Sequence, residues 1–210
     1  SKEIEAETVI ISTGATAKYL GIESEQRLIG GGVSACATCD GFFYKGQDVV
    51  VVGAGDTAAE EATYLANICS KVTILVRKDY MRASKAMQHR VNKTENIEVL
   101  YNTELDEVLG ENVVEGVRVV NNLTGKKYQI DITGVFIAIG HKPNTELFKD
   151  VLEMDEVGYL ITEGKSTKTN LPGVFAAGDV QDKEYRQAIT AAGTGCMAAL
   201  DAERYLGALK

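Results

Sequence analysis

One strand–turn–helix segment constrains the fold of this chain more than any other feature. Residues Asp48–Val52 form a nearly continuous β-branched run, which is typical of a strand buried on both faces. The run leads into Gly53-Ala54-Gly55-Asp56-Thr57-Ala58 and then into a helical pattern that ends near Ala66. A second β-branched run, Lys71–Val76, follows the helix. Strand, helix and strand within about thirty residues predict a βαβ unit, and with it an α/β fold with a parallel sheet.

The rest of the chain predicts a change from parallel to antiparallel pairing and back. Three short strand patterns joined by turns predict an antiparallel meander at 104–109, 113–120 and 127–132. A buried strand pattern returns at 134–140, and Lys142-Pro143-Asn144 then marks an expected domain boundary. Elsewhere the sequence predicts strands at 8–12, 97–100 and 174–177 and helices at 84–92 and 186–206.

The glycine-rich turn after the first strand of the βαβ unit predicts a dinucleotide site. Gly53 permits the tight turn, Gly55 lets the backbone approach a pyrophosphate, and Ala58 keeps the helix close to the sheet. A motif of this kind is weak evidence alone, because glycines punctuate many strand–helix turns. Its place between a strand and a helix is what favours a nucleotide.

The end of the second strand indicates which nucleotide is bound. An NAD site usually has a carboxylate there for the ribose 2′-hydroxyl. Here the strand is followed by Arg77 and Lys78, with Arg82 close behind. Three cations in this position suit a 2′-phosphate and therefore NADPH, because guanidinium and phosphate pair in a fork. The alternative is an exposed basic turn without a ligand.

A dithiol motif precedes the βαβ unit. Cys36 and Cys39 are separated by two residues and are followed at once by Asp40. Such a pair can close a small disulfide, and its thiolate often forms more readily than that of a lone cysteine. Asp40 could deliver or take up the proton that thiol–disulfide exchange needs. These three residues are the predicted catalytic group.

The alternative for the dithiol is half of a zinc site. Tetrahedral zinc would need two further ligands, and no other pair has ligand spacing among the remaining candidates Cys69, Cys196, His89 and His141. No metal is therefore expected. Cys69 and Cys196 lie among apolar or small neighbours, and we expect both to be buried.

Composition excludes several classes of partner. The net charge of −8 argues against nucleic acid or an anionic membrane as the main partner. The sequence contains no apolar run long enough to span a bilayer and no signal-peptide pattern. With four cysteines in 210 residues, the chain is no disulfide-stapled scaffold, and a cytoplasmic location with a catalytic dithiol is expected.

Four motifs together resemble the bacterial low-molecular-weight thioredoxin reductases, and the resemblance covers nearly the whole chain. They are the segments 36–46, with its Cys-Ala-Thr-Cys-Asp-Gly core, 53–58, 173–180 and 185–205. The resemblance implies a flavoenzyme that carries electrons from NADPH through FAD to the dithiol and on to thioredoxin. It also implies a homodimer.

The resemblance implies a role for individual residues as well. Cys39 would be the thiol next to the flavin, Cys36 the thiol that attacks the partner's disulfide, and Asp40 the acid–base residue. The implied NADPH contacts are Gly53, Gly55, Asp56, Thr57, Ala58, Arg77, Lys78 and Arg82, although Val76 stands where many members have a histidine. The implied FAD contacts are Asp179, Arg186, Gln187 and Ala188.

One part of the family pattern has no counterpart in this sequence. Members begin with an FAD-binding βαβ unit that carries its own glycine fingerprint, and no second fingerprint follows a strand here. We therefore expect a truncated chain whose activity alone is left open. Its expected parts are a remnant FAD-domain strand at 1–13, an NADPH-binding domain with the dithiol at 14–141, and the C-terminal piece of a split FAD domain at 142–210.

Two other interpretations are kept. The flavoprotein component of a peroxide-reducing system shares this architecture but usually has a different dithiol motif. A binding module that holds NADPH without passing electrons would also carry the glycine turn and the three cations. Bound flavin and disulfide reduction would separate an enzyme from such a module.

Overall fold

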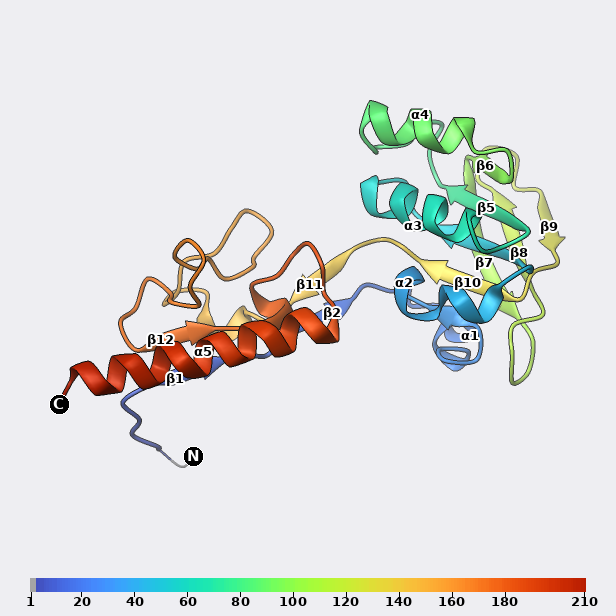
Figure 1. Cartoon of the computed structure of the whole chain (residues 1–210). Coiled ribbons are helices and arrows are strands. Elements are labelled where there is room, and N and C mark those ends of the chain that lie inside the picture. Colours follow the sequence, from blue (N-terminus) through green and yellow to red (C-terminus); the bar gives the residue numbers. More distant parts are fainter. Residues whose placement is uncertain (1–2) are drawn as a thin grey trace. The chain divides into compact units, whose positions relative to one another are not determined.

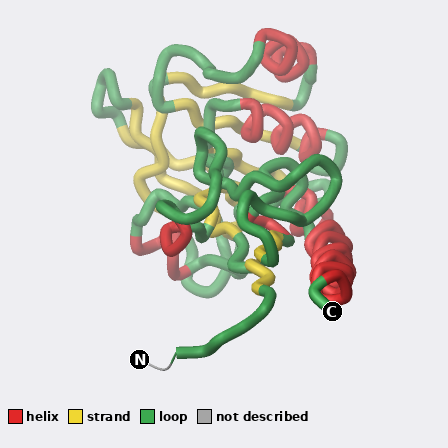
Figure 2. The backbone as a smooth tube through the Cα atoms, turned by 90° about the vertical axis from the view of Figure 1, so that its left-hand side faces the viewer, coloured by secondary structure: helices red, strands yellow, loops and turns green. Residues whose placement is uncertain are grey.

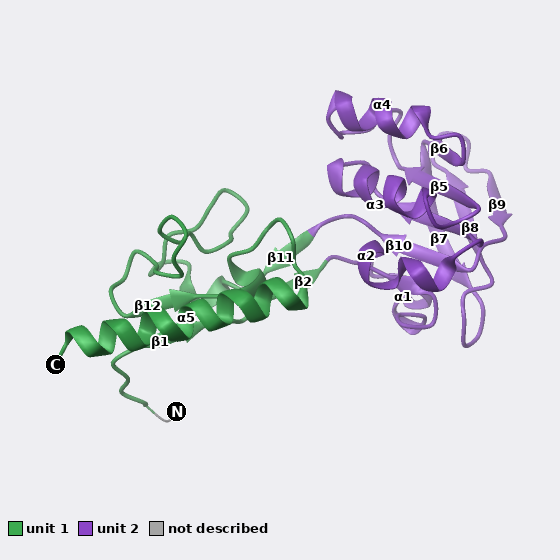
Figure 3. Ribbon diagram, in the orientation of Figure 1, with its two compact units in different colours: residues 1–17, 141–210 green, residues 18–140 purple. Residues whose placement is uncertain are grey.

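The chain forms two compact units in the computed structural model, which describes residues 3–210 (Figure 1). Unit 1 combines the two ends of the chain, up to Ala17 and from His141 onward, and unit 2 is the continuous segment Lys18–Gly140 (Figure 3). The functional labels attached above to the ranges 1–13, 14–141 and 142–210 stay predictions.

Unit 2 is built on a parallel sheet of five strands. Its order is β3-β10-β4-β5-β6, and every neighbouring pair is parallel. The strands are β3 (Val33–Ser34), β10 (Gly134–Ile137), β4 (Asp48–Val52), β5 (Lys71–Val76) and β6 (Ile97–Tyr101). The order places β4 at the centre of the sheet. This is the strand that the sequence marks as buried on both faces.

The two faces of the sheet are covered by different structures. Val49 and Val51 of β4 pack toward α3 (Asp56–Ala66) and α4 (Lys85–Lys93), whereas Val50 and Val52 belong to the core on the opposite face. That opposite core is closed by the antiparallel meander β7 (Thr103–Leu109), β8 (Gly116–Asn121) and β9 (Lys127–Ile130). Helices, parallel sheet and meander therefore form three layers, and Figure 2 shows α3 and α4 on one side of the strands.

Short elements connect these layers. The helix α1 (Glu23–Arg27) carries a fully buried carboxylate, Glu25, which accepts the backbone N–H groups of Leu20 at 3.0 Å and Gly21 at 2.8 Å. These bonds satisfy a charge that burial would otherwise make costly. After β3 come α2 (Ala37–Asp40) and the 3₁₀ turn η1 (Gly41–Tyr44). Tyr44 packs edge-on against Phe136 of β10, with ring centroids 5.4 Å apart.

Unit 1 is organised around a pair of parallel strands and a long helix. Strand β1 (Val9–Ile11) pairs with β12 (Val174–Ala176), and β2 (Ala15–Ala17) pairs antiparallel with β11 (His141–Pro143). The helix α5 (Ala188–Ala208) packs on β12 through a small core of Phe175, Ala177, Ala198 and Ala202. The 3₁₀ turns η2 (Glu146–Phe148) and η3 (Gly178–Val180) complete the unit.

The structure confirms the predicted fold class, with its parallel sheet and three-stranded meander. The bounds of β4 and β5 agree with the sequence prediction, and the remaining predicted elements agree to within a few residues. The sequence did not predict α1, α2, β3 or the β2–β11 pair. These elements are two to five residues long, which is too short for a periodic pattern.

One prediction about burial is wrong. Cys69 is buried as expected, but Cys196 is exposed. Cys196 lies on the face of α5 that carries the exposed side chains of Ile189, Met197 and Leu200, and not on the face that packs against β12. Apolar neighbours in sequence predict burial only when the helix face that they share is covered.

Candidate functional site

The dithiol is closed as a disulfide between Cys36 and Cys39, with their Cα atoms 5.3 Å apart. Cys36 caps the N-terminus of α2 with an extended backbone, and its Sγ accepts the N–H of Cys39 at 3.2 Å. The first turn of α2, from its N-cap Cys36 to Cys39, is thus what brings two cysteines three positions apart into bonding distance.

Asp40 lies beside the disulfide at the end of α2. Its backbone N–H donates to the carbonyl of Cys36 at 3.1 Å, and its Oδ2 accepts the hydroxyl of Ser34 at 2.6 Å. Two phenols share this environment. Burial raises the pKa of Tyr19 and of Tyr44, and the negative charge of Asp40 adds to both increases. The predicted catalytic residues Cys36, Cys39 and Asp40 are therefore brought together by one short segment.

A pocket of about 610 Å³ lies in unit 2 at the carboxyl ends of the parallel strands. Val52 of β4, Leu75 of β5 and Ala138 after β10 form part of its wall. In open parallel sheets, ligands bind in the crevice at this edge. The position of the pocket thus follows from the strand order.

The glycine turn forms one wall of this pocket. Gly53 has a φ of +155°, and a Cβ there would come within 2.7 Å of the Cβ of Ala58, so only glycine fits this approach of turn and helix. Gly55 is the N-cap of α3, and a Cβ built on it meets nothing within 4 Å. Backbone N–H groups at the start of an eleven-residue helix beside an open glycine suit a pyrophosphate.

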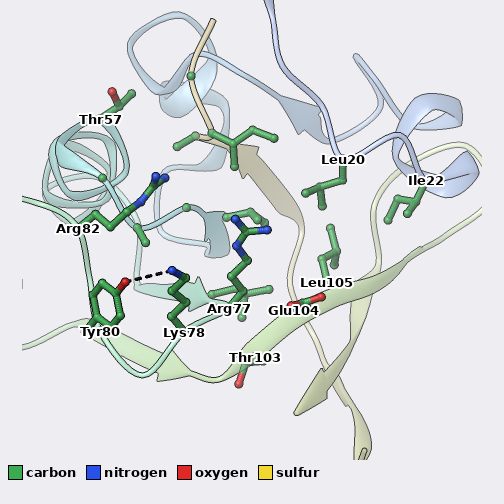
Figure 4. A pocket seen from close by; sticks show the side chains of 18 residues that line it. Leu20, Ile22, Thr57, Arg77, Lys78, Tyr80, Arg82, Thr103, Glu104 and Leu105 are labelled. Carbon is green, nitrogen blue, oxygen red and sulfur yellow. Dashed lines mark hydrogen bonds between the residues drawn. The ribbon is translucent and has the colours of Figure 1, made fainter. Parts of the chain in front are cut away.

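The predicted cations line the same pocket. Arg77, Lys78 and Arg82 all line it, and Figure 4 shows their side chains converging on its interior. The backbone N–H of Arg82 donates to the carbonyl of Ala54 at 2.7 Å, which holds the basic loop against the glycine turn. Open backbone at a helix start and three cations in one cavity could hold the phosphates of a dinucleotide.

Two of the predicted motif residues do not line the pocket. Ala58 is fully buried beneath Gly53. Asp56 is exposed, and its Oδ1 accepts the N–H of Ser84 at 2.9 Å. Hydrogen bonds from Ser84 lower the pKa of Asp56. Both residues support the pocket from outside, whereas Thr57 lies in its wall.

The pocket is also lined by residues that the sequence analysis did not single out, among them Tyr80, Glu104, Leu20 and Ile22. Tyr80 accepts a hydrogen bond from Lys78 Nζ at 3.0 Å, and the ammonium lies 5.2 Å from its ring centroid. Because Tyr80 lies between Lys78 and Arg82 in the sequence, its contribution to the pocket could have been predicted. Glu104, Leu20 and Ile22 come from β7 and from the segment before α1, and only the tertiary structure brings them here.

The predicted flavin contacts gather in unit 1 where η3 meets α5. Asp179 lies in η3, and the neighbouring N–H of Gly178 donates to Thr194 Oγ1 of α5 at 2.9 Å. Arg186 has a left-handed backbone with φ +48°, and its N–H donates to Asp182. Gln187 caps α5 in a reciprocal pair with Thr190, and Ala188 begins the helix. Asp179 and the start of α5 therefore lie on two elements that pack together.

Within residues 3–210 no cluster of three or more histidine, cysteine or acidic side chains is placed to hold a metal ion. None of the helices described for this chain combines the length and apolar character needed to cross a membrane.

A pocket at the carboxyl edge of a parallel sheet and a cysteine disulfide thus lie in one α/β unit, a combination that is expected of a nucleotide-linked disulfide oxidoreductase. The family model for pyridine nucleotide-disulphide oxidoreductases matches residues 1–195. A thioredoxin reductase of Rickettsia conorii is 56% identical over 207 residues, which is 97% of this chain and 67% of the relative. One of Dictyostelium discoideum is 56% identical over 210 residues, which is 99% of this chain and 66% of the relative.

Solved structures give the same result. The thioredoxin reductase of Streptococcus pyogenes has a TM-score of 0.91 and 40% identity, covering 96% of this chain and 66% of that one. The enzyme of Giardia duodenalis has a TM-score of 0.90 and 45% identity, covering 95% of this chain and 66% of that one. The chain belongs to the pyridine nucleotide-disulphide oxidoreductase family and, within it, to the thioredoxin reductases, of whose length it spans about two thirds.

The four cysteines should differ sharply in reactivity. Burial and the charge of Asp48 raise the pKa of Cys69 to about 11, so at about pH 8 roughly one thiol in a thousand is ionised. With the disulfide intact, iodoacetamide should therefore modify Cys196 alone in the native protein, as read by peptide mass spectrometry. Reduction should add Cys36 and Cys39. The Cys196→Ser control should show no label before reduction, and labelling of native Cys69 would contradict this assignment.

Proposed function

We propose that this chain carries the NADPH site and the redox dithiol of a thioredoxin reductase, and that the protein passes electrons from NADPH to the disulfide of thioredoxin. The observation that carries the proposal is the disulfide between Cys36 and Cys39 with Asp40 beside it, in the same unit as the nucleotide pocket. The names of the relatives support thioredoxin as the partner.

The proposed exchange proceeds in two steps. In the reduced protein the thiolate of Cys36 attacks one sulfur of the partner's disulfide, which breaks that bond and leaves a mixed disulfide. The thiolate of Cys39 then attacks Cys36 Sγ, so that the Cys36–Cys39 disulfide re-forms and the partner leaves as a dithiol. Two electrons move to the partner. Asp40 moves a proton to or from the sulfur next to it.

The transfer can be measured on this chain without any cofactor. The chain is reduced with dithiothreitol, freed of reagent and mixed with oxidised thioredoxin, and thioredoxin thiols are counted by alkylation. We expect transfer of one disulfide equivalent. Cys36→Ser should abolish transfer, whereas Cys39→Ser should trap the mixed disulfide at Cys36. A mixed disulfide trapped by Cys36→Ser instead would reverse the assigned roles, and no transfer by the unaltered chain would refute the proposal.

An exposed aromatic pair offers a contact surface for a protein substrate. Phe42 and Phe43, in η1 directly after the dithiol, are 70% and 73% exposed. Replacing both with alanine should slow transfer to thioredoxin and leave the reduction of a small disulfide unchanged. Equal rates for thioredoxin in the variant and the unaltered chain would exclude this surface.

For the nucleotide, we propose NADPH in preference to NADH. The residues that would hold it are the backbone of Gly53 and Gly55 at the pyrophosphate and Arg77, Lys78 and Arg82 at the 2′-phosphate. The convergence of the three cations within the pocket supports this choice. Such a cluster favours a phosphate over a hydroxyl because each contact is a charge-assisted hydrogen bond.

Charge removal tests this preference. Arg77→Ala with Lys78→Ala should weaken NADPH binding by about 1–3 kcal/mol and NADH binding by much less, measured by calorimetric titration of the chain. Arg90→Ala with Lys93→Ala removes two charges from the last turn of α4, away from the pocket, and should change neither affinity. Equal losses for both cofactors in the first variant would place the 2′-phosphate elsewhere.

We also propose a flavin site to which unit 1 contributes. Asp179 would accept hydroxyl groups of the cofactor, and the start of α5, with Arg186, Gln187 and Ala188, would face its polar portion. A bound flavin would accept the hydride of NADPH and pass its two electrons on to the disulfide. The strained backbone of Arg186 supports a functional constraint at this point, because such conformations gather at ligand sites.

The visible absorption spectrum tests the flavin proposal. The chain is incubated with excess FAD and freed of unbound cofactor. A retained flavin band that NADPH bleaches is the expected result if these 210 residues hold the cofactor, and Asp179→Ala should reduce it. A colourless chain that still binds NADPH would support the second candidate, a nucleotide-binding module that passes no electrons. Homodimerisation and a cytoplasmic location stay predictions, and sedimentation velocity tests the first of them.

A further inference from the structure

One buried hydroxyl joins two parts of the dithiol segment. Ser34, only 7% exposed, is the last residue of β3. Its Oγ donates to Asp40 Oδ2 at 2.6 Å and accepts the backbone N–H of Cys36 at 3.0 Å. The carbonyl oxygen of Cys36 also lies 3.4 Å from this Oγ. A single hydroxyl therefore connects the backbone of Cys36 to the carboxylate of Asp40.

The assignment of the hydroxyl proton follows from these distances. Ser34 has one proton, and the bond to Asp40 is short enough for a charge-assisted O–H···O⁻ contact, whereas the contact to the Cys36 carbonyl is much longer. The N–H of Cys36 can only donate, so it fills a lone pair of Oγ. The hydrogen bonds thus run in one direction, from Cys36 N–H through Ser34 to Asp40.

Ser34 belongs to the parallel sheet, whereas the residues that it contacts lie beyond the end of its strand. Its strand pairs in register with β10, so that Ser34 lies opposite Phe136, a residue of the central core. Asp40 instead ends a four-residue helix that leads into a 3₁₀ turn. Functional groups on short elements keep their geometry when a residue on a rigid strand holds them.

We infer that Ser34 is a positioning residue for thiol–disulfide exchange, fixing the carboxylate of Asp40, the residue that follows Cys39, and the backbone of Cys36. The inference rests on the proposed function, in which Asp40 moves the proton. During reduction by an external dithiol, one reagent thiolate attacks a sulfur of the Cys36–Cys39 bond, and the second displaces the mixed disulfide. The reagent leaves as a cyclic disulfide, and two electrons and two protons remain on the cysteines. Ser34 itself gains and loses nothing.

The test measures the rate at which excess dithiothreitol reduces the disulfide of the full chain. Samples are quenched at intervals, and the reduced fraction is read by mass spectrometry. Ser34→Ala should slow reduction about ten-fold, and Ser34→Thr, which keeps the hydroxyl, should restore most of the rate. Ser70→Ala is the matched control, because Ser70 also donates a hydroxyl hydrogen bond, to Gly46, but lies outside the dithiol segment. It should reduce at the unaltered rate. Thermal unfolding of each variant checks that unit 2 is intact.

A double-mutant cycle with Asp40→Asn decides whether Ser34 acts through Asp40. If it does, Ser34→Ala should cause little further loss in the Asp40→Asn background. Full additivity of the two losses, or an unchanged rate for Ser34→Ala alone, would overturn the inference and leave the role of Asp40 standing. An unchanged rate for Asp40→Asn would instead refute the proposed proton transfer, and the inference with it.

Discussion

Burial of β4 on both faces is the constraint on which unit 2 depends. Val49, Val50 and Val51 have no exposed surface, and alternate side chains enter two separate cores. Neither the helices α3 and α4 nor the β7–β9 meander could bury its own apolar side without this sheet between them. Because the strand must end abruptly at Gly53, the same constraint places the glycine turn at the carboxyl edge, where the pocket opens. The packing of the core and the position of the pocket thus have one origin.

The dithiol depends on the same sheet by a different route. Strand β3 is an edge strand of two residues whose register on β10 sets where α2 begins. The disulfide and Asp40 lie on that short continuation, and Ser34 couples them back to the strand. The disulfide and Asp40 therefore lie on short elements that the parallel sheet supports. Proteins commonly combine reactive groups with fixed geometry in this way.

The sequence allowed the central layer and the chemical motifs to be predicted, but not the details that tertiary contacts decide. Strands β4 and β5 were predictable because burial on both faces requires unbroken apolar runs. The dithiol and the basic loop were predictable because they are local in sequence. The contribution of Glu104 to the pocket depends on chain segments that meet only in the fold. The bond between Ser34 and Asp40 is local, but it depends on the turn between β3 and α2, two elements too short to be predicted from a periodic pattern. Cys196 was assigned wrongly because its helix face, and not its neighbours, decides exposure.

The continuity of unit 2 has a consequence for how such a protein can change. Its first and last residues, Lys18 and Gly140, are joined by an N–H···O bond of 2.9 Å, so the segment leaves unit 1 and returns at nearly the same point. Because the two ends of unit 2 are adjacent, its insertion requires no distortion of unit 1 and adds little loop-closure entropy. Because the pocket and the disulfide both lie within this continuous segment, they belong to one inserted unit and do not depend on residues from two separate parts of the chain.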